Sequence, residues 1–142
     1  ETVMGMDAML RKLISLSAIT VHQPVLEKID FESIVEQVKQ DLNRQLTTKN
    51  IDLEVSVGEH LHYISQPEVV KSILFNLLEN AIIFSNAEGN AFVKVKVYKS
   101  DDHIFIKVQD NGIGIAPEYH QQIFHLFFRG HILSQGNGLG LY

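Results

Sequence analysis

The sequence contains no cysteine, so disulfides, thiolate metal sites, iron–sulfur clusters and thiol catalysis are all excluded. It also lacks any apolar run near the ~18 residues of a membrane span, so we expect a chain that sits in water and has no membrane segment. Positive charge is scarce, because 12 Lys and Arg face 17 Asp and Glu for a formal net charge of −5. Without a bulk positive field to attract a phosphate backbone, nucleic acid is not an expected partner.

What the 142 residues do contain is enough apolar side chain for a folded core, with 45% hydrophobic and only 20% charged residues. The length predicts one globular domain with a piece of a second. The best boundary is His22-Gln23-Pro24, because proline disfavours helix in the residue before it. We therefore expect the end of a helix in residues 1–22 and a globular domain in residues 23–142.

Apolar periodicity predicts the helices, and apolar–polar alternation predicts the strands. Helices are expected over Met4–Ile19, from an Asp30 cap to about Lys49-Asn50, over Pro67–Phe84 and, as a short stretch, near Pro117–Phe124. Strands are expected over Val25–Phe31, Ile51–Val57, a short piece with Tyr63 and Ile64, and a hairpin of Phe92–Tyr98 and Ile104–Val108 that turns at Ser100-Asp101-Asp102 and leaves one face wet. This order predicts an α+β two-layer sandwich, with a mixed, mostly antiparallel sheet and helices on one face.

Two asparagines on the expected central helix form the first candidate site. Asn76 and Asn80 are four residues apart, so their side chains share a helix face. Their amide oxygens suit Mg²⁺, which prefers oxygen ligands and needs few protein contacts when phosphates supply the rest. Ordinary polar helix surface explains the same pair.

The segment after the hairpin, Asp110-Asn-Gly-Ile-Gly114, is the second candidate. A carboxylate at a strand end is held rigidly and could accept a hydrogen bond from an exocyclic amine, while the glycines bring backbone close to a flat ligand. The alternative is a simple turn, since Asp-Asn-Gly is strong turn chemistry in any protein.

Two further motifs lie near the end of the sequence. Gly136-Asn-Gly-Leu-Gly140 has the composition of a phosphate cradle built from backbone N–H groups, although a flexible tail explains it too. It matches neither the Walker loop nor the dinucleotide fingerprint. Ile123–Gly130 combines three phenylalanines and Arg129 with flanking glycines, which suits a hinged lid or an ordinary buried helix end.

Taken in order, four motifs resemble the N, G1, F and G2 boxes of sensor histidine kinases. They are Asn76-Leu-Leu-Glu-Asn80-Ala, Asp110-Asn-Gly-Ile-Gly, Ile123-Phe-His-Leu-Phe-Phe-Arg-Gly130 and Gly136-Asn-Gly-Leu-Gly140-Leu. The resemblance covers about the second half of the chain closely. It implies the Bergerat ATP-binding fold of the GHKL ATPases, with residues 1–22 as the end of a dimerisation-domain helix.

The resemblance implies ATP and Mg²⁺ as ligands. Asp110 would accept the adenine amino group, Gly112 and Gly114 would make room for the ring, and Asn80 with Asn76 would hold Mg²⁺. The full set of nucleotide-binding residues implied is Asn76, Asn80, Phe84, Asp110, Gly112, Gly114, Ile115, Phe127, Arg129, Gly136, Gly138, Leu139 and Gly140.

The activity implied is transfer of the γ-phosphoryl of ATP to a histidine outside this chain and onward to the receiver domain of a response regulator, in the cytoplasm. The other implied partner is the kinase's own dimerisation and phosphoacceptor domain, in a homodimer of the full-length protein. The apolar stripe of Met6, Leu10, Leu13 and Ile14, on a helix at the chain end with few local partners, suits such a dimer contact better than core packing. Asn76 favours a kinase over a hydrolytic relative, which usually carries a water-activating glutamate there.

Three departures from the family pattern stand out. Ile83 replaces a Lys or Arg that contacts phosphate, no phosphoacceptor box is present, and the family's domain normally continues beyond the position of Tyr142. An incomplete sheet and a missing phosphate contact are therefore expected. The main alternative is a degenerate, non-catalytic nucleotide-binding or interaction module. A separate pair, His60 and His62, would point the same way on a strand and could bind a metal, which we rank far lower.

Overall fold

The computed structural model describes residues 25–86, 89–125, 128 and 141. The chain divides into two compact units, one of residues Leu26–Ile115 and one of Glu1–Val25 with Ala116–Tyr142. The helix predicted over Met4–Ile19 and the predicted boundary at residues 22–24 lie outside the described residues.

The larger unit contains two long helices and the strands that pack on them. Its elements are β1 (Glu27–Lys28), α2 (Phe31–Thr48), β2 (Asp52–Val57), β3 (Ile64–Ser65), α3 (Pro67–Ile83), β4 (Phe92–Ser100) and β5 (His103–Asp110). Both helices and the hairpin occur where periodicity predicts them. The second unit contributes one described element, the 3-10 helix η1 (Pro117–Tyr119).

The start of α2 follows the predicted capping chemistry. Asp30 has extended backbone angles, and its Oδ1 accepts a hydrogen bond from Ser33 N at 3.0 Å. This bond satisfies one of the N–H groups that a helix start leaves without an intrahelical partner. Asp30 thus stops the preceding extended segment and starts the helix.

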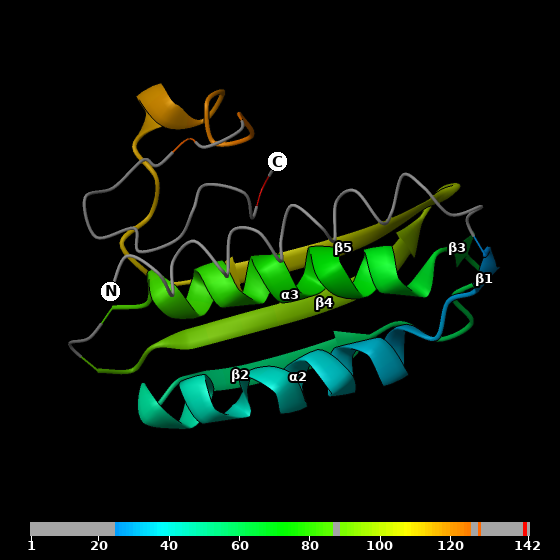
Figure 1. Ribbon diagram of the computed structural model, residues 1–142, viewed down its shortest axis with the longest axis horizontal. Helices are drawn as coiled ribbons and strands as arrows, with labels where there is room; N and C mark the ends of the chain where they lie inside the picture. Colours follow the sequence, from blue (N-terminus) through cyan, green and yellow to red (C-terminus); the bar gives the residue numbers. More distant parts are fainter. Residues whose placement is uncertain (1–24, 87–88, 126–127, 129–140, 142) are drawn as a thin grey trace, which may run out of the picture. The chain divides into compact units, whose positions relative to one another are not determined.

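The larger sheet, which has three strands, is mixed. Its strand order is β2-β4-β5, in which β2 and β4 are parallel and β4 and β5 are antiparallel. A second, two-residue antiparallel pair joins β1 to β3. Figure 1 shows α2 and α3 lying along the strands of the larger sheet.

The two faces of β4 differ sharply. Val93, Val95 and Val97 are at most 1% exposed and share one core cluster with the buried residues of α2 and α3, whereas Lys94 and Lys96 are exposed. Because side chains alternate along a strand, both helices cover the valine face and the lysine face is open to water. The predicted sandwich with helices on one face is therefore confirmed, as is the wet face of the hairpin.

Three local predictions were wrong or incomplete. The strand predicted over Val25–Phe31 shrinks to Glu27–Lys28, because Asp30 caps α2 and Phe31 is already helical. His60 and His62 lie in a loop, where His60 takes a positive φ of 56°, so they do not share a strand face. The short helical stretch predicted near Pro117–Phe124 forms only a 3-10 turn, in which Tyr119 N donates a hydrogen bond to Ala116 O at 2.9 Å. Irregular turns follow it.

In the parts of the chain that the structure describes, no helix has the length and apolar character needed to cross a membrane.

Candidate functional site

Asp110 is the last residue of β5, and it lies opposite Val93 in the β4–β5 ladder. Directly opposed residues project from the same face of a sheet, so the Asp110 carboxylate faces the side that α2 and α3 cover. Its Oδ1 accepts a hydrogen bond from Gly112 N at 2.8 Å. The carboxylate is therefore held at the strand end by its own loop.

The loop after Asp110 is seated on the end of α3. Ile113 N donates to Phe84 O at 3.1 Å, and Phe84 is the C-cap of that helix. A Cβ built on Gly112 would lie 2.3 Å from Phe84 O and 2.9 Å from Asp110 Oδ1. Glycine is therefore required at position 112, because any larger residue would push the loop off the helix.

Beyond this seat the loop opens out. Gly114 has a φ of +70°, and among the described residues a Cβ on it would meet nothing within 4 Å. Ile113 and Ile115 are 51% and 48% exposed. Within the described part of the chain, the Gly114 backbone and the partly exposed Ile113 and Ile115 side chains therefore leave space beside the loop, which is the setting that a flat ligand needs.

Asn111 clamps the same loop to the start of β4. Its Oδ1 accepts from Phe92 N at 2.9 Å, and its Nδ2 donates to Asn90 O at 3.0 Å. The side chain therefore replaces a missing rung of the ladder beyond Asp110. Sequence reasoning treated Asn111 only as turn chemistry and missed this role.

We expect Asn111→Ala to lower the free energy of unfolding by about 1–2 kcal/mol, because two hydrogen bonds are lost at once. Urea denaturation measures the change. Gln109→Ala, an exposed change two residues earlier, is the control and should stay within about 0.5 kcal/mol of the parent chain. Equal stabilities of the two variants would contradict the clamp.

Asn76 and Asn80 lie one turn apart on α3, and both are half-buried. Leu74 and Leu78 alternate with them and fill the core, so the two amides lie on the side of the helix away from the core. The predicted sharing of a face is therefore confirmed. Ile83, the last residue of α3, is 36% exposed.

A clearly shifted pKa occurs away from the candidate site, at Lys94. Lys94 Nζ is 2.6 Å from Glu54 Oε2 on the open face of the sheet, and that hydrogen bond and charge raise the pKa of Lys94. Since both groups are exposed, the pair is a surface feature and not part of the candidate site.

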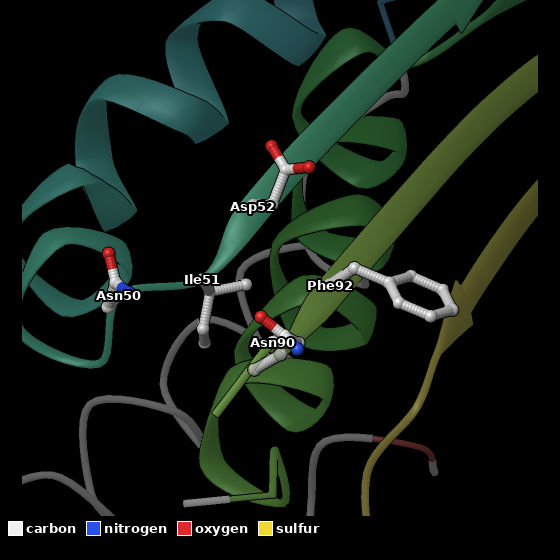
Figure 2. Close-up of a pocket in the computed structure, with 6 residues that line it drawn as sticks. Asn50, Ile51, Asp52, Asn90 and Phe92 are labelled. Carbon is white, nitrogen blue, oxygen red and sulfur yellow. The ribbon is translucent and has the colours of Figure 1, made fainter. Parts of the chain in front are cut away.

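Two cavities are lined by residues other than those of the Asp110–Gly114 loop and the asparagines of α3. One of about 490 Å³ is lined by Asn50, Ile51, Asp52, Asn90, Ala91 and Phe92. Figure 2 shows these residues at the starts of β2 and β4. A second, of about 440 Å³, contains His60 and His62. Among the described residues no group of three or more His, Asp and Glu is placed to hold a metal ion.

Several predicted site residues lie outside the described part of the chain. They are Phe127, Arg129, Gly136, Gly138, Leu139 and Gly140. The described residues bring together one end of the predicted site, formed by the Asp110–Gly114 loop and the last turn of α3. Lys49, which also reaches this turn, was not singled out by the sequence.

A mixed sheet with helices on one face, and a D-x-G-x-G loop seated on a helix end, define an ATP-binding domain of the Bergerat type. The chain belongs to the histidine kinase-, DNA gyrase B- and HSP90-like ATPase family, whose model matches residues 65–142. The family resemblance and fold class that the sequence predicts are therefore confirmed. Membership in an ATPase family implies that ATP is the ligand of this domain.

The similar proteins are histidine kinases. The chain is 33% identical over 123 residues to the histidine protein kinase SaeS of Staphylococcus epidermidis, covering 82% of this chain and 35% of that kinase. It thus spans about a third of the length of that relative. A mycobacterial sensor histidine kinase, MprB, superimposes with a TM-score of 0.72 at 28% identity, over 82% of this chain and 74% of that one. Full-length ShkA, solved in complex with AMPPNP, superimposes with a TM-score of 0.71 at 25% identity, over 84% of this chain and 25% of that one.

Proposed function

We propose that this chain is the ATP-binding catalytic part of a two-component sensor histidine kinase. The observation that carries the proposal is the seat of the Asp110 loop on the end of α3, where a strand-end carboxylate and an open glycine backbone lie next to the helix of Asn76 and Asn80. The histidine kinases among the similar proteins support it.

The proposal assigns adenine recognition to the Asp110 loop. Because Oδ1 is used by Gly112 N, Oδ2 is the oxygen that would accept the exocyclic amine. Among the described residues nothing lies within 4 Å of a Cβ on Gly114, which leaves room for the ring, and the proposal assigns Phe84 and Ile115 as its apolar contacts. The loop geometry thus provides a hydrogen-bond acceptor and an apolar edge, which together distinguish adenine from a base without an amino group.

The same proposal places Mg²⁺ on α3. Asn80, with Asn76 one turn before it, offers oxygen ligands on one helix face, which fits an ion that takes few protein contacts. When bound, Mg²⁺ neutralises charge on the nucleotide phosphates. Gly136, Gly138, Leu139 and Gly140 would cradle the phosphates, and the lid with Phe127 and Arg129 would exclude water.

The type of reaction that we propose follows from the side chain at position 76 of α3. Asn76 has no basicity to activate water, so the site favours positioning of the γ-phosphoryl over hydrolysis. The acceptor is a histidine outside this chain, on a dimerisation domain whose last helix ends in residues 1–22, with the catalytic domain in residues 23–142. The phosphoryl group then passes to a response regulator. The proposal places this domain in the cytoplasm and makes the full-length kinase a homodimer.

Asp110→Asn tests the proposal. We expect calorimetry to show Mg·ADP binding to the parent chain and at least about tenfold weaker binding to the variant, because a hydrogen bond to a charged acceptor is lost. Asp102→Asn, an exposed carboxylate at the hairpin turn, is the matched control and should bind as the parent does. Absence of Mg·ADP binding by the folded parent would overturn the proposal for this chain.

Ile83 favours a second candidate, a nucleotide-binding module that does not catalyse. An aliphatic side chain, 36% exposed, ends α3 where the family commonly has a cation for phosphate. Phosphotransfer from ATP to a supplied dimerisation domain separates the two functions. Binding without transfer supports the module, whereas transfer supports the kinase.

A further inference from the structure

The ammonium group of Lys49 lies at the C-terminal end of α3. Lys49 is the C-cap residue of α2, and its Nζ donates to Ile82 O at 2.6 Å and to Ile83 O at 2.9 Å. These contacts join residues more than 30 positions apart in the chain. They tie the end of one helix to the end of the next.

The end of α3 needs such a partner. The last turn of α3 contains no basic residue, although its carbonyls lack intrahelical partners and the helix dipole places negative charge there. Ser85 Oγ also donates to Ile82 O, at 2.8 Å. Lys49 therefore supplies, from another helix, the cation that the last turn of α3 lacks.

This same turn supports both halves of the described site. Phe84 N donates to Asn80 O at 3.0 Å, so the turn that Lys49 holds contains Asn80. Phe84 O accepts from Ile113 N at 3.1 Å and faces Gly112. Because Asn111 also anchors this loop to the start of β4, a shift of the helix end would change the position of Asn80 relative to the Asp110 loop.

We infer that Lys49 is a positioning residue for the nucleotide site. Its ammonium fixes the last turn of α3, and that turn sets the position of Asn80 relative to the Asp110–Gly114 loop. The residue acts through backbone carbonyls and does not itself contact the ligand. This inference rests on the proposed ATP site and extends it to a residue on α2.

Lys49→Met tests the inference, because methionine keeps an unbranched side chain and removes the charge. We expect about tenfold weaker Mg·ADP binding by calorimetry at a temperature where all variants are folded, as is usual when a supporting partner of a site is lost. Lys49→Arg should restore most of the affinity, because it keeps a cation that donates to the same carbonyls.

Lys71→Met is the matched control. Lys71 Nζ also links α3 to α2, through Asp41 Oδ2 at 3.1 Å, but near the start of α3. If nucleotide affinity depended only on a link between α2 and α3, wherever that link lies, both lysine variants would weaken Mg·ADP binding equally. Unchanged affinity in Lys49→Met, or equal losses in Lys49→Met and Lys71→Met, would overturn the inference.

Amide NMR separates this inference from the proposed function. Lys49→Met should shift the Ile113 and Gly112 N–H resonances and speed their hydrogen exchange, while Lys71→Met should not. If the parent chain fails to bind Mg·ADP, the proposed function fails and these amides still decide whether Lys49 positions the loop. Unperturbed Ile113 and Gly112 amides in Lys49→Met would refute the positioning role.

Discussion

Gly112→Ala is expected to abolish measurable Mg·ADP binding and to lower the free energy of unfolding by about 2–3 kcal/mol, the usual cost of overpacking. The added Cβ would lie 2.3 Å from Phe84 O, a backbone atom at the end of α3 that no side-chain rotation can move away. The loop must therefore leave its seat, which breaks the Ile113 N to Phe84 O hydrogen bond and displaces Asp110. Calorimetry measures the binding, and urea denaturation measures the stability.

Gly89→Ala is the control for this experiment. Gly89 has a φ of +99°, and among the described residues its Cβ would meet nothing within 4 Å, so the substitution introduces backbone strain without a clash. We expect it to cost about 1 kcal/mol of stability and to leave Mg·ADP affinity unchanged. Binding of Mg·ADP by Gly112→Ala with the affinity of the parent would contradict the seat of the loop on α3.

Leu78→Ala is expected to lower the free energy of unfolding by about 3 kcal/mol, within the range for leucine truncation in a core. Leu78 is 1% exposed and packs in the cluster that joins α2 and α3 to the sheet. The cost combines the lost transfer free energy of the side chain with a cavity that the neighbouring valines of β4 cannot fill. A domain of this size has only about 5–15 kcal/mol of stability in total, so the loss is large.

Ile73→Ala on the same helix is the comparison for Leu78. Ile73 is 48% exposed, so its truncation removes little buried area, and alanine favours helix. We expect a change within about 0.5 kcal/mol in urea denaturation. Similar losses for Leu78→Ala and Ile73→Ala would show that the core does not lie on the face of α3 that the structure places against the sheet.

The long elements were predictable because their signals are local. Asp30 precedes an apolar stripe at helical spacing, and the strands of the hairpin alternate on either side of Asp101-Asp102. Short elements were harder to predict from the sequence. The two-residue strands β1 and β3 depend on pairing with each other, and no periodicity extends over two residues. For that reason the strand predicted over Val25–Phe31 was too long.

For the candidate site, the order of the motifs predicted Asp110, Gly112 and the asparagines of α3. It did not identify what holds them. Asn111 reaches the backbone of Asn90 and Phe92 across the hairpin, and this contact follows from register and not from the motif itself.

The sequence by itself determined the helices α2 and α3, the hairpin, the capping of α2 and the family of the chain, because periodicity, capping and motif spacing are properties of neighbouring residues. Only the tertiary structure decided that β2 pairs in parallel with β4, that Phe84 O supports Gly112, and that Lys49 reaches the end of α3. Each of these joins segments that lie far apart along the chain. Such contacts form only when a shared core brings the segments together, so local patterns contain no record of them.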